Sequence, residues 1–291
     1  MSPHKIGVCS WSLQPDDPET LIERVRRCGL SGLQLALGLL VRQPGTWDRA
    51  AGAIREAGIE ILSGMLAFAG EDYSTLAKIA RTGGVRPDEA WEENRAHARA
   101  VADIAAAADI GLVTFHAGFI PEAPGPGPGP CAGPGAASAE RAKLLDRLRE
   151  IADLYDARNV ALALETGQET ADTLLEALAE LDRPNVGVNF DPANMILYGK
   201  GDPVAALKKL STHVRQVHIK DALPSAPDAA PGQWGKEVPA GTGAVDWPAF
   251  FEVAMAIVPR VNYVIEREAG GSRIEDVKAA GELVRRHIGA Q

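Results

Sequence analysis

Four acidic or imidazole side chains stand at the ends of short apolar runs in the second half of the chain. Runs of this length and composition are typical of strands that are buried on both faces. The runs begin at residues 160, 185, 214 and 263, and they lead to Glu165, Asp191, His218 and Glu266. Parallel α/β folds bind their ligands at the carboxyl ends of strands, so we expect these four side chains to face one site.

Three carboxylates held close together repel one another, and the usual remedies are proton uptake or a bound cation. A histidine among them favours the cation. Oxygen-rich ligation with one imidazole suits Mn²⁺ or Mg²⁺, and Co²⁺ is tolerated. Glu165 and Glu266 are also candidates for acid and base catalysis, because a metal that polarises a carbonyl or hydroxyl eases removal of an adjacent carbon-bound proton.

Strand-like and helix-like segments alternate along the whole chain. Asp17-Pro18 and Asp202-Pro203 are typical helix starts, with an N-cap followed by proline. The expected strands are 5–11, 32–37, 59–66, 112–116, 160–165, 185–191, 214–221 and 263–266, and the clearest helices are 17–28, 46–57, 88–108, 138–155, 170–181 and 272–288. Strict alternation predicts a single (β/α)8 TIM barrel. An open doubly wound sheet is disfavoured, because residues 9–12 lack a glycine-rich phosphate turn.

The expected domain is one barrel over residues 1–291, interrupted by a loop insertion at 121–135. This segment is almost entirely proline, glycine and alanine, so it cannot contribute to a core. A linker between two domains is the alternative. It is rejected because the alternation of strands and helices resumes unchanged after the segment.

Composition excludes several classes of partner. The formal net charge of −9 argues against binding to nucleic acid or to an anionic membrane. No apolar run is long enough to cross a bilayer and no leader-like segment begins the chain, so a cytoplasmic location is expected. The three cysteines have no metal-knuckle spacing, and Cys9 and Cys28 are expected to be buried, reduced thiols.

The strand ends carry motifs that resemble a known family. They are Ala163-Leu-Glu165, Asn189-Phe-Asp191-Pro-Ala-Asn194, Val217-His-Ile-Lys220-Asp221, Gly241-Thr-Gly243 and Ile265-Glu266. The chain resembles the xylose isomerase-like TIM barrel superfamily, in particular its sugar phosphate isomerase/epimerase branch. The resemblance implies that Glu165, Asp191, His218 and Glu266 hold one divalent metal. It also implies that the two glutamates move protons on a carbohydrate through an enediolate-like intermediate, and that the protein is a homodimer or homotetramer.

The expected activity is therefore a metal-dependent isomerase or epimerase of sugars or sugar phosphates. One departure from the family pattern narrows the range of expected activities. Ketose 3-epimerases of the superfamily tend to have histidine three residues after the strand-six aspartate, where this chain has Asn194, and they differ around Lys220-Asp221. This disfavours epimerisation of free ketohexoses and leaves open a dehydratase or lyase acting on a keto-sugar or inosose. The expected substrate contacts are Trp11, His116, Asn194 and Lys220, with Phe68 as a second wall of the pocket.

Three other functions are alternatives to a metal-dependent isomerase or epimerase. A metal-independent glycoside hydrolase would use Glu165 and Glu266 as its carboxylate pair, but it needs neither His218 nor a third acid. A DNA-repair phosphodiesterase related to endonuclease IV would need many histidines and a basic surface, and the chain has six histidines and a negative charge. A non-catalytic sugar-binding barrel remains open. Glu71 and His213 are expected on the solvated surface.

Overall fold

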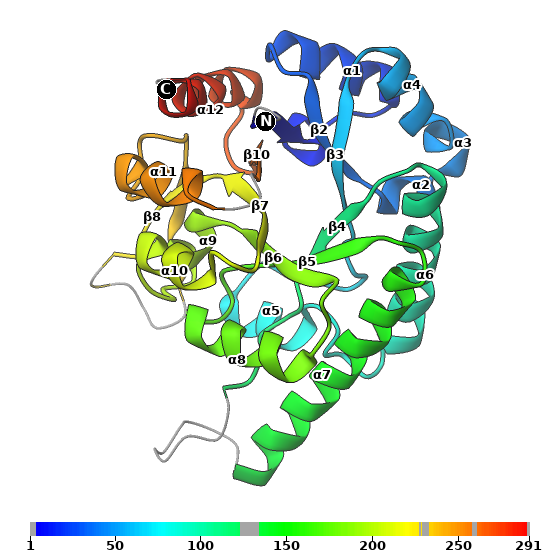
Figure 1. Ribbon diagram of the computed structural model, residues 1–291, viewed down its shortest axis with the longest axis vertical. Coiled ribbons are helices and arrows are strands. Elements are labelled where there is room, and N and C mark those ends of the chain that lie inside the picture. The colour runs from blue at the N-terminus through cyan, green and yellow to red at the C-terminus, as the bar shows by residue number, and fades with distance from the viewer. Residues whose placement is uncertain (1–3, 123–133, 227, 229–232, 258–260, 290–291) are drawn as a thin grey trace.

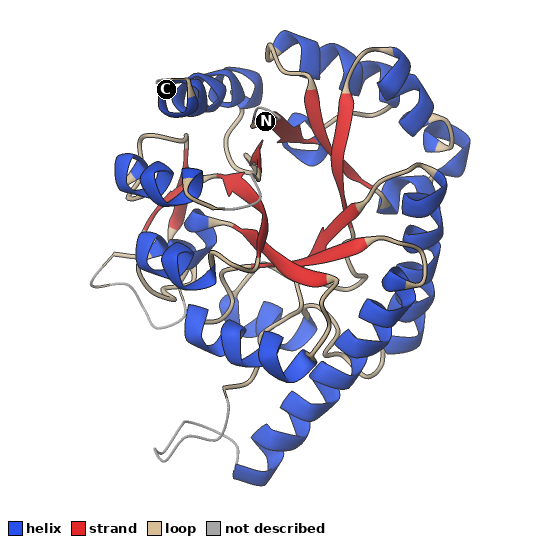
Figure 2. Ribbon diagram, viewed as in Figure 1, coloured by secondary structure: helices blue, strands red, loops and turns tan. Residues whose placement is uncertain are grey.

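The computed structural model describes residues 4–122, 134–226, 228, 233–257 and 261–289. Eight parallel strands close into a barrel in the order β1-β10-β7-β6-β5-β4-β3-β2. Figures 1 and 2 show these strands at the centre of the molecule with helices around them. The strands are β1 (Ile6–Cys9), β2 (Gly32–Ala36), β3 (Glu60–Met65), β4 (Leu112–Phe115), β5 (Ala161–Glu165), β6 (Val186–Phe190), β7 (Val214–Ile219) and β10 (Asn262–Ile265). The predicted (β/α)8 barrel is confirmed.

A helical layer surrounds the barrel and covers the outward-facing apolar side chains of the strands. Asp17 and Asp202 accept hydrogen bonds from backbone N–H groups in the first turns of their helices, at 2.7 Å each, so both predicted helix starts are confirmed. The main helices are α1 (Pro18–Arg27), α4 (Ala50–Glu56), α6 (Trp91–Ala107), α7 (Pro134–Asp156), α8 (Ala171–Leu181), α10 (Pro203–Leu210), α11 (Trp247–Met255) and α12 (Arg273–Ile288).

Short elements lie between the strands and the main helices. They are η1 (Ser10–Leu13), α2 (Gly38–Arg42), α3 (Pro44–Trp47), α5 (Leu76–Thr82), α9 (Pro192–Leu197), β8 (Asp221–Leu223) and β9 (Lys236–Val238). Three expected boundaries were therefore wrong. The first strand ends at Cys9, the helix expected at 46–57 is divided into α3 and α4, and the strand expected at 214–221 leaves the barrel after Ile219. The last difference arises because β8 pairs with β9 in an antiparallel hairpin instead of continuing in the barrel.

The expected loop insertion at 121–135 falls mostly outside the described residues, which resume at residue 134. Helix α7 already begins at Pro134, earlier than the predicted start at Ser138. The described helices include none that is both long enough and apolar enough to cross a membrane. Cys9 and Cys28 are buried free thiols, as predicted, while Cys131 lies outside the described residues.

A layer of polar side chains fills part of the barrel interior. Side chains on a strand alternate between its two faces, and the inward-facing set includes residues that hydrogen-bond across the barrel. The Gln34 side-chain amide donates to the Thr114 hydroxyl at 2.7 Å. The Gln216 side-chain amide donates to the side-chain oxygen Oδ1 of Asn189 at 3.2 Å. The Ser63 hydroxyl donates to Gln216 at 2.7 Å. Barrel interiors are usually filled by branched apolar residues, so this layer marks the floor of a polar site.

Candidate metal centre and pocket

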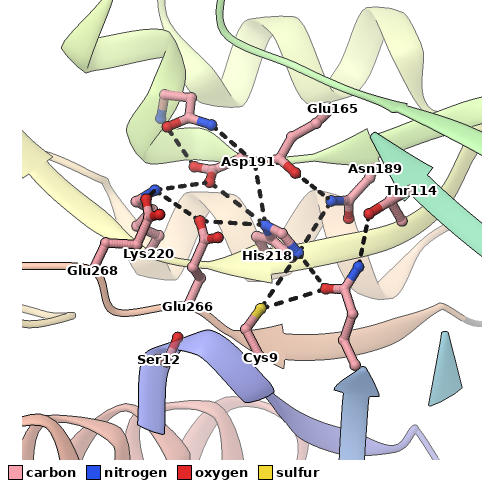
Figure 3. Close-up of polar contacts among 12 residues, drawn as sticks. Cys9, Ser12, Thr114, Glu165, Asn189, Asp191, His218, Lys220, Glu266 and Glu268 are labelled. Carbon is pink, nitrogen blue, oxygen red and sulfur yellow. Dashed lines mark hydrogen bonds and ion pairs between the residues drawn. The ribbon is translucent and has the colours of Figure 1, made fainter. Parts of the chain in front are cut away.

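The four predicted residues come together at the carboxyl ends of adjacent strands. β5, β6, β7 and β10 are consecutive in the barrel, and alternation along each strand turns the four side chains inward. Figure 3 shows Glu165, Asp191 and Glu266 arranged around the His218 ring. One nitrogen or oxygen atom from each of the four residues lies within 4.8 Å of the others, and all four residues are buried.

Hydrogen bonding at the far side of the ring fixes the orientation of the His218 imidazole. Its Nε2 lies 2.8 Å from Gln34 Oε1, an acceptor, so Nε2 carries a proton and donates it to that oxygen. Nδ1 then faces the carboxylates, 3.5 Å from Glu165, 3.7 Å from Asp191 and 3.6 Å from Glu266. At protein metal sites, the ligating histidine usually donates its other ring N–H to an acceptor in this way. Burial would lower the pKa of His218, but Glu165 and the other negative groups nearby outweigh it and raise the pKa well above the usual value.

Two buried polar atoms in the cluster lack a hydrogen-bond partner, namely His218 Nδ1 and Asp191 Oδ2. Leaving such atoms unpaired costs free energy, and a cation between them would satisfy both. The three carboxylates and one neutral imidazole match the donors that Mn²⁺ and Mg²⁺ take, and separations of 3.5 to 3.7 Å leave room for a cation between the atoms. The residues present therefore fit a divalent metal ion.

Charges within the cluster set the protonation of its members. Burial favours neutral carboxyl groups and raises the pKa of Asp191, although Lys220 opposes the rise. Burial acts on Glu266 too, but Lys220 and His218 outweigh it and hold its pKa well below the usual range. The pKa of Glu165 is also lowered, because the imidazoles of His116 and His218 outweigh its burial. Both glutamates are therefore held as carboxylates.

Amide groups position the Glu165 carboxylate. Asn189 Nδ2 donates to one of its oxygens at 3.1 Å, and Asn194 Nδ2 donates to the other at 3.0 Å. Asn194 belongs to α9, whose first turn is capped by Asp191 Oδ1 at 2.9 Å from the Asn194 backbone N–H. The loop between β5 and α8 approaches Asn194 closely at position 167. Glycine is required there, because a Cβ would lie 2.3 Å from the Asn194 Cβ.

Two side chains donate hydrogen bonds to the Glu266 carboxylate, one neutral and one positively charged. Trp11 Nε1 donates to Glu266 Oε1 at 2.8 Å, and Lys220 Nζ donates to Glu266 Oε2 at 2.7 Å. Lys220 also donates to Glu268 at 2.7 Å and lies 3.9 Å from Asp191. Burial would lower the pKa of Lys220, but the surrounding carboxylates outweigh it and raise the pKa well above the usual value. Lys220 is therefore a fixed cation at the edge of the cluster.

A cavity of about 650 Å³ opens above the cluster. All four predicted substrate contacts line it, together with Glu266; they are Trp11, His116, Asn194 and Lys220. His116 Nε2 lies 3.5 Å from Glu165, and its buried Nδ1 has no hydrogen-bond partner. The structure therefore brings the predicted contacts to one pocket.

Two expectations about individual residues were wrong. Phe68 does not line the cavity but is buried in the core, where it packs edge-on against Phe115 with ring centroids 5.7 Å apart. Glu71 is not a solvated surface residue, since it lines the cavity and accepts a hydrogen bond from the Gly84 N–H at 2.9 Å. Burial raises the pKa of Glu71, although His116 partly offsets this. A carboxylate in a long loop gives no sequence signal for such a position.

Sequence reasoning missed the residues that hold the predicted ligands in place. Gln34 and Asn189 each contact His218 Nε2, and Glu268 shares Lys220 with Glu266. The sequence does carry a signal for Gln34 and Asn189. Each is a polar side chain at an inward-facing position within an apolar strand, where burial requires hydrogen-bonding partners. Glu268 lies beyond its strand and has no such signal.

Fold and site together define a (β/α)8 barrel protein with a buried acidic and imidazole cluster beneath a pocket at the carboxyl ends of its strands. The family model described as "Xylose isomerase-like TIM barrel" matches residues 22–287. The chain belongs to this family, as its strand-end motifs predicted.

Individual relatives are similar over different lengths. A xylose isomerase domain protein from Planctomyces limnophilus shares 31% sequence identity, with a TM-score of 0.83 and 100% of both chains covered. The 3-keto-D-glucoside 4-epimerase of E. coli shares 17% identity and the fold, with a TM-score of 0.71, and the match covers 97% of this chain and 99% of the epimerase. The 3-dehydroshikimate dehydratase of Bacillus anthracis is 35% identical over 86 residues, a match that spans 28% of this chain and 30% of the dehydratase. The named enzymes in this comparison thus include an epimerase and a dehydratase.

Proposed function

We propose that this protein is a divalent-metal-dependent isomerase or epimerase that acts on a carbohydrate by proton transfer. The observation that carries the proposal is the pair of unpartnered buried atoms, His218 Nδ1 and Asp191 Oδ2, which face each other at 3.7 Å beneath the pocket. A purely structural network would give each of these atoms a hydrogen bond, whereas their ion pairs here are 3.5 to 3.9 Å long. A metal site leaves them for the ion.

The proposed metal ligands are Glu165, Asp191, His218 and Glu266. When bound, Mn²⁺ or Mg²⁺, or Co²⁺ in their place, would polarise a carbonyl or hydroxyl of the substrate and so acidify the neighbouring carbon-bound hydrogen. Gln34 keeps the proton of His218 on Nε2, away from the carboxylates. Metal binding would displace protons from Asp191 and His218, because burial raises the pKa of Asp191 and the neighbouring carboxylates raise the pKa of His218.

Glu165 and Glu266 are the proposed acid–base pair. Neighbouring positive groups outweigh burial and lower the pKa of both, so each is held as a carboxylate, the form that can accept a proton from a carbon atom that the metal would acidify. Return of the proton by the same glutamate to the neighbouring carbon gives isomerisation through an enediolate-like intermediate. Epimerisation requires the glutamate on the opposite face to take a proton from solvent and deliver it there, while the first glutamate releases its proton to solvent. His116, with its unpartnered Nδ1, and Lys220 are placed to hold substrate hydroxyl groups.

A dehydratase or lyase is the second candidate. The local match to a 3-dehydroshikimate dehydratase favours it, and the same proton abstraction next to a carbonyl would start the elimination of water. The two reactions differ in the mass of the product. Mass spectrometry of reaction mixtures decides between them, because an isomerase or epimerase leaves the mass unchanged and a dehydratase lowers it by one water molecule.

The central test is metal content and Mn²⁺ affinity of the purified protein beside two isosteric variants, Glu165→Gln and Asp191→Asn. Each variant removes one ligand charge, and we expect Mn²⁺ affinity to fall at least about 100-fold, with proton exchange into keto-sugars in D₂O lost. Glu60→Gln is the matched control, because Glu60 is an exposed carboxylate at the opposite end of β3. Unchanged Mn²⁺ affinity in both variants, or turnover that resists a chelator, would refute the proposal.

A further inference from the structure

We propose that the substrate is a neutral sugar ring with a bulky apolar substituent, such as an aryl glycoside, and this inference rests on the proposed function. The sugar would lie over the metal centre. The substituent would lie in the outer part of the cavity, between Leu39 on one side and Tyr198 and Trp234 on the other. Volume, the arrangement of the walls and charge each support this assignment.

The cavity is too large for a free monosaccharide. Its volume of about 650 Å³ corresponds to roughly 20 water molecules at about 30 Å³ each, whereas a hexose has about a dozen covalently linked, closely packed non-hydrogen atoms. A free sugar would leave close to half of the space to water. Pockets of this size normally enclose a ligand of roughly twice that number of atoms.

The outer walls are apolar and come from opposite sides of the barrel. Leu39 follows β2, while Leu197 and Tyr198 follow β6 and Trp234 follows β7. β2 and β3 lie opposite β6 and β7 in the closed order of strands, so the two sets of side chains form a slot. A slot of this kind accommodates a flat apolar group.

Neighbouring rings brace the aromatic wall. The Tyr198 and Trp234 rings meet edge to face at 4.8 Å between centroids, and Phe119 packs edge-on against Tyr198 at 5.7 Å. The backbone beside Trp234 is held to α9 by the Gly235 N–H, which donates to the Leu197 carbonyl oxygen at 3.3 Å. An aromatic surface fixed in this way loses little conformational entropy when a ligand binds to it.

Charges around the cavity disfavour an anionic substrate. The described lining residues include four carboxylates, Glu71, Glu237, Glu266 and Glu268, and two full cations, Arg42 and Lys220. Lys220 is already bound by Glu266 and Glu268. Among the described lining residues, Arg42 is then the one full cation without an ion pair, so a phosphate group would meet a single such cation against four carboxylates. This separates the proposed substrate from the sugar phosphates.

The substituent also limits the reaction. An aryl group on the anomeric oxygen prevents opening of the sugar ring, and interconversion of an aldose and a ketose requires the open form. The proton removed by Glu165 or Glu266 must then lie next to a carbonyl elsewhere on the ring. Epimerisation or loss of water at such a carbon satisfies this condition.

The test measures binding of phenyl and methyl β-D-glycosides to the Mn²⁺-loaded protein by calorimetry, for the gluco, galacto and xylo sugars, with glucose 6-phosphate alongside. For at least one sugar, we expect the phenyl glycoside to bind at least about tenfold more tightly than the methyl glycoside, as burial of an aromatic ring predicts. The ratio should fall to about threefold or less in Trp234→Ala. It should remain in Trp91→Ala, a matched control whose indole packs outside the cavity beneath Arg147.

Equal affinities for phenyl and methyl glycosides of every sugar would overturn the inference, as would an unchanged ratio in Trp234→Ala or tighter binding of glucose 6-phosphate than of any glycoside. Proton exchange in D₂O separates this failure from that of the proposed function. Exchange into free keto-sugars without any preference for phenyl glycosides retains the function and overturns the apolar slot. A phenyl preference that Trp234→Ala abolishes, in a protein whose Mn²⁺ affinity is unaffected by Glu165→Gln and Asp191→Asn, supports the slot and overturns the function.

Discussion

Asp221 anchors the hairpin beside the candidate metal centre, and we expect its replacement by asparagine to lower the free energy of unfolding by an amount that its hydrogen bonds predict. The buried carboxylate accepts hydrogen bonds from the backbone N–H groups of Ala222 and Val245 at one oxygen. Its other oxygen accepts from Gly241, Gly243 and the Trp247 indole, at 2.9 to 3.0 Å. Every polar neighbour in these contacts is a donor, so the site accepts a carboxylate and opposes an amide.

In Asp221→Asn, an NH₂ group must replace one of the two oxygens. The less costly orientation places the NH₂ against Ala222 and Val245, where two N–H donors lose their acceptor. Each unsatisfied donor costs about 1–3 kcal/mol, and the lost charge weakens the other three bonds. Some relief comes from movement of the loop, so we expect a loss of about 3 kcal/mol in the free energy of unfolding.

The same substitution should disturb catalysis indirectly. The hairpin that Asp221 anchors carries Glu237, which accepts hydrogen bonds from Arg267 at 2.6 Å and from the Glu268 N–H at 2.9 Å. Glu268 in turn holds Lys220. We therefore expect kcat/KM to fall while the Mn²⁺ content stays at the wild-type level, because no metal ligand is changed.

The assay is urea unfolding of chelator-treated protein, so that metal binding does not contribute to the measured stability. Asp202→Asn is the matched control. Asp202 is an exposed N-cap that accepts a single N–H from Ala205 at 2.7 Å, and asparagine caps helices about as well as aspartate. If Asp221→Asn and Asp202→Asn both lower the free energy of unfolding by less than about 1 kcal/mol, the proposed role of the five hydrogen bonds is wrong.

Three further predictions follow from buried groups around the site. Burial raises the pKa of Glu169 from 4.5 to about 8, against an opposing effect of Lys200, so the folded state takes up a proton more readily than the unfolded state. Stability should therefore fall as pH rises from about 4.5 to about 8, by at most about 5 kcal/mol at 1.4 kcal/mol per pH unit, and Glu169→Gln should flatten this profile in urea titrations. Gln34→Met removes the acceptor for the His218 Nε2–H and should weaken Mn²⁺ binding about 10- to 100-fold by calorimetry, and unchanged affinity would contradict the assigned tautomer. Lys220→Met removes a cation from beside the carboxylates, so it should leave Mn²⁺ binding intact or tighter while lowering kcat/KM, and loss of the metal in this variant would refute the separation of the two roles.

The sequence alone located the four candidate ligands, for a physical reason. In a barrel of alternating strands and helices all strands are parallel, so their carboxyl ends share one face. A polar residue at the end of each apolar run must then lie on that face. Glu165, Asp191, His218 and Glu266 follow this rule, and the rule requires only local patterns and the order of elements along the chain.

Local patterns did not predict the contacts that orient these ligands. The bond between Gln34 and His218 joins residues 184 positions apart, and the bond between Lys220 and Glu268 depends on the path of the chain after its strand. Glu71, in a long loop, lines the cavity where the Gly84 N–H, 13 residues further along the chain, donates to its carboxylate. Helix α9 also escaped prediction, because it is shorter than the segments in which helical periodicity can be recognised.

The sequence by itself determined the barrel, the identity of its strand-end side chains and the preference of three acids and one imidazole for a divalent cation. These depend on periodicity, capping and ligand chemistry, which neighbouring residues along the chain specify. Only the tertiary structure decided the orientation of the His218 ring, the position of Lys220 between two glutamates and the apolar slot between opposite walls. Each of these is set by groups brought together from distant strands, because closing the barrel is what fixes their separation.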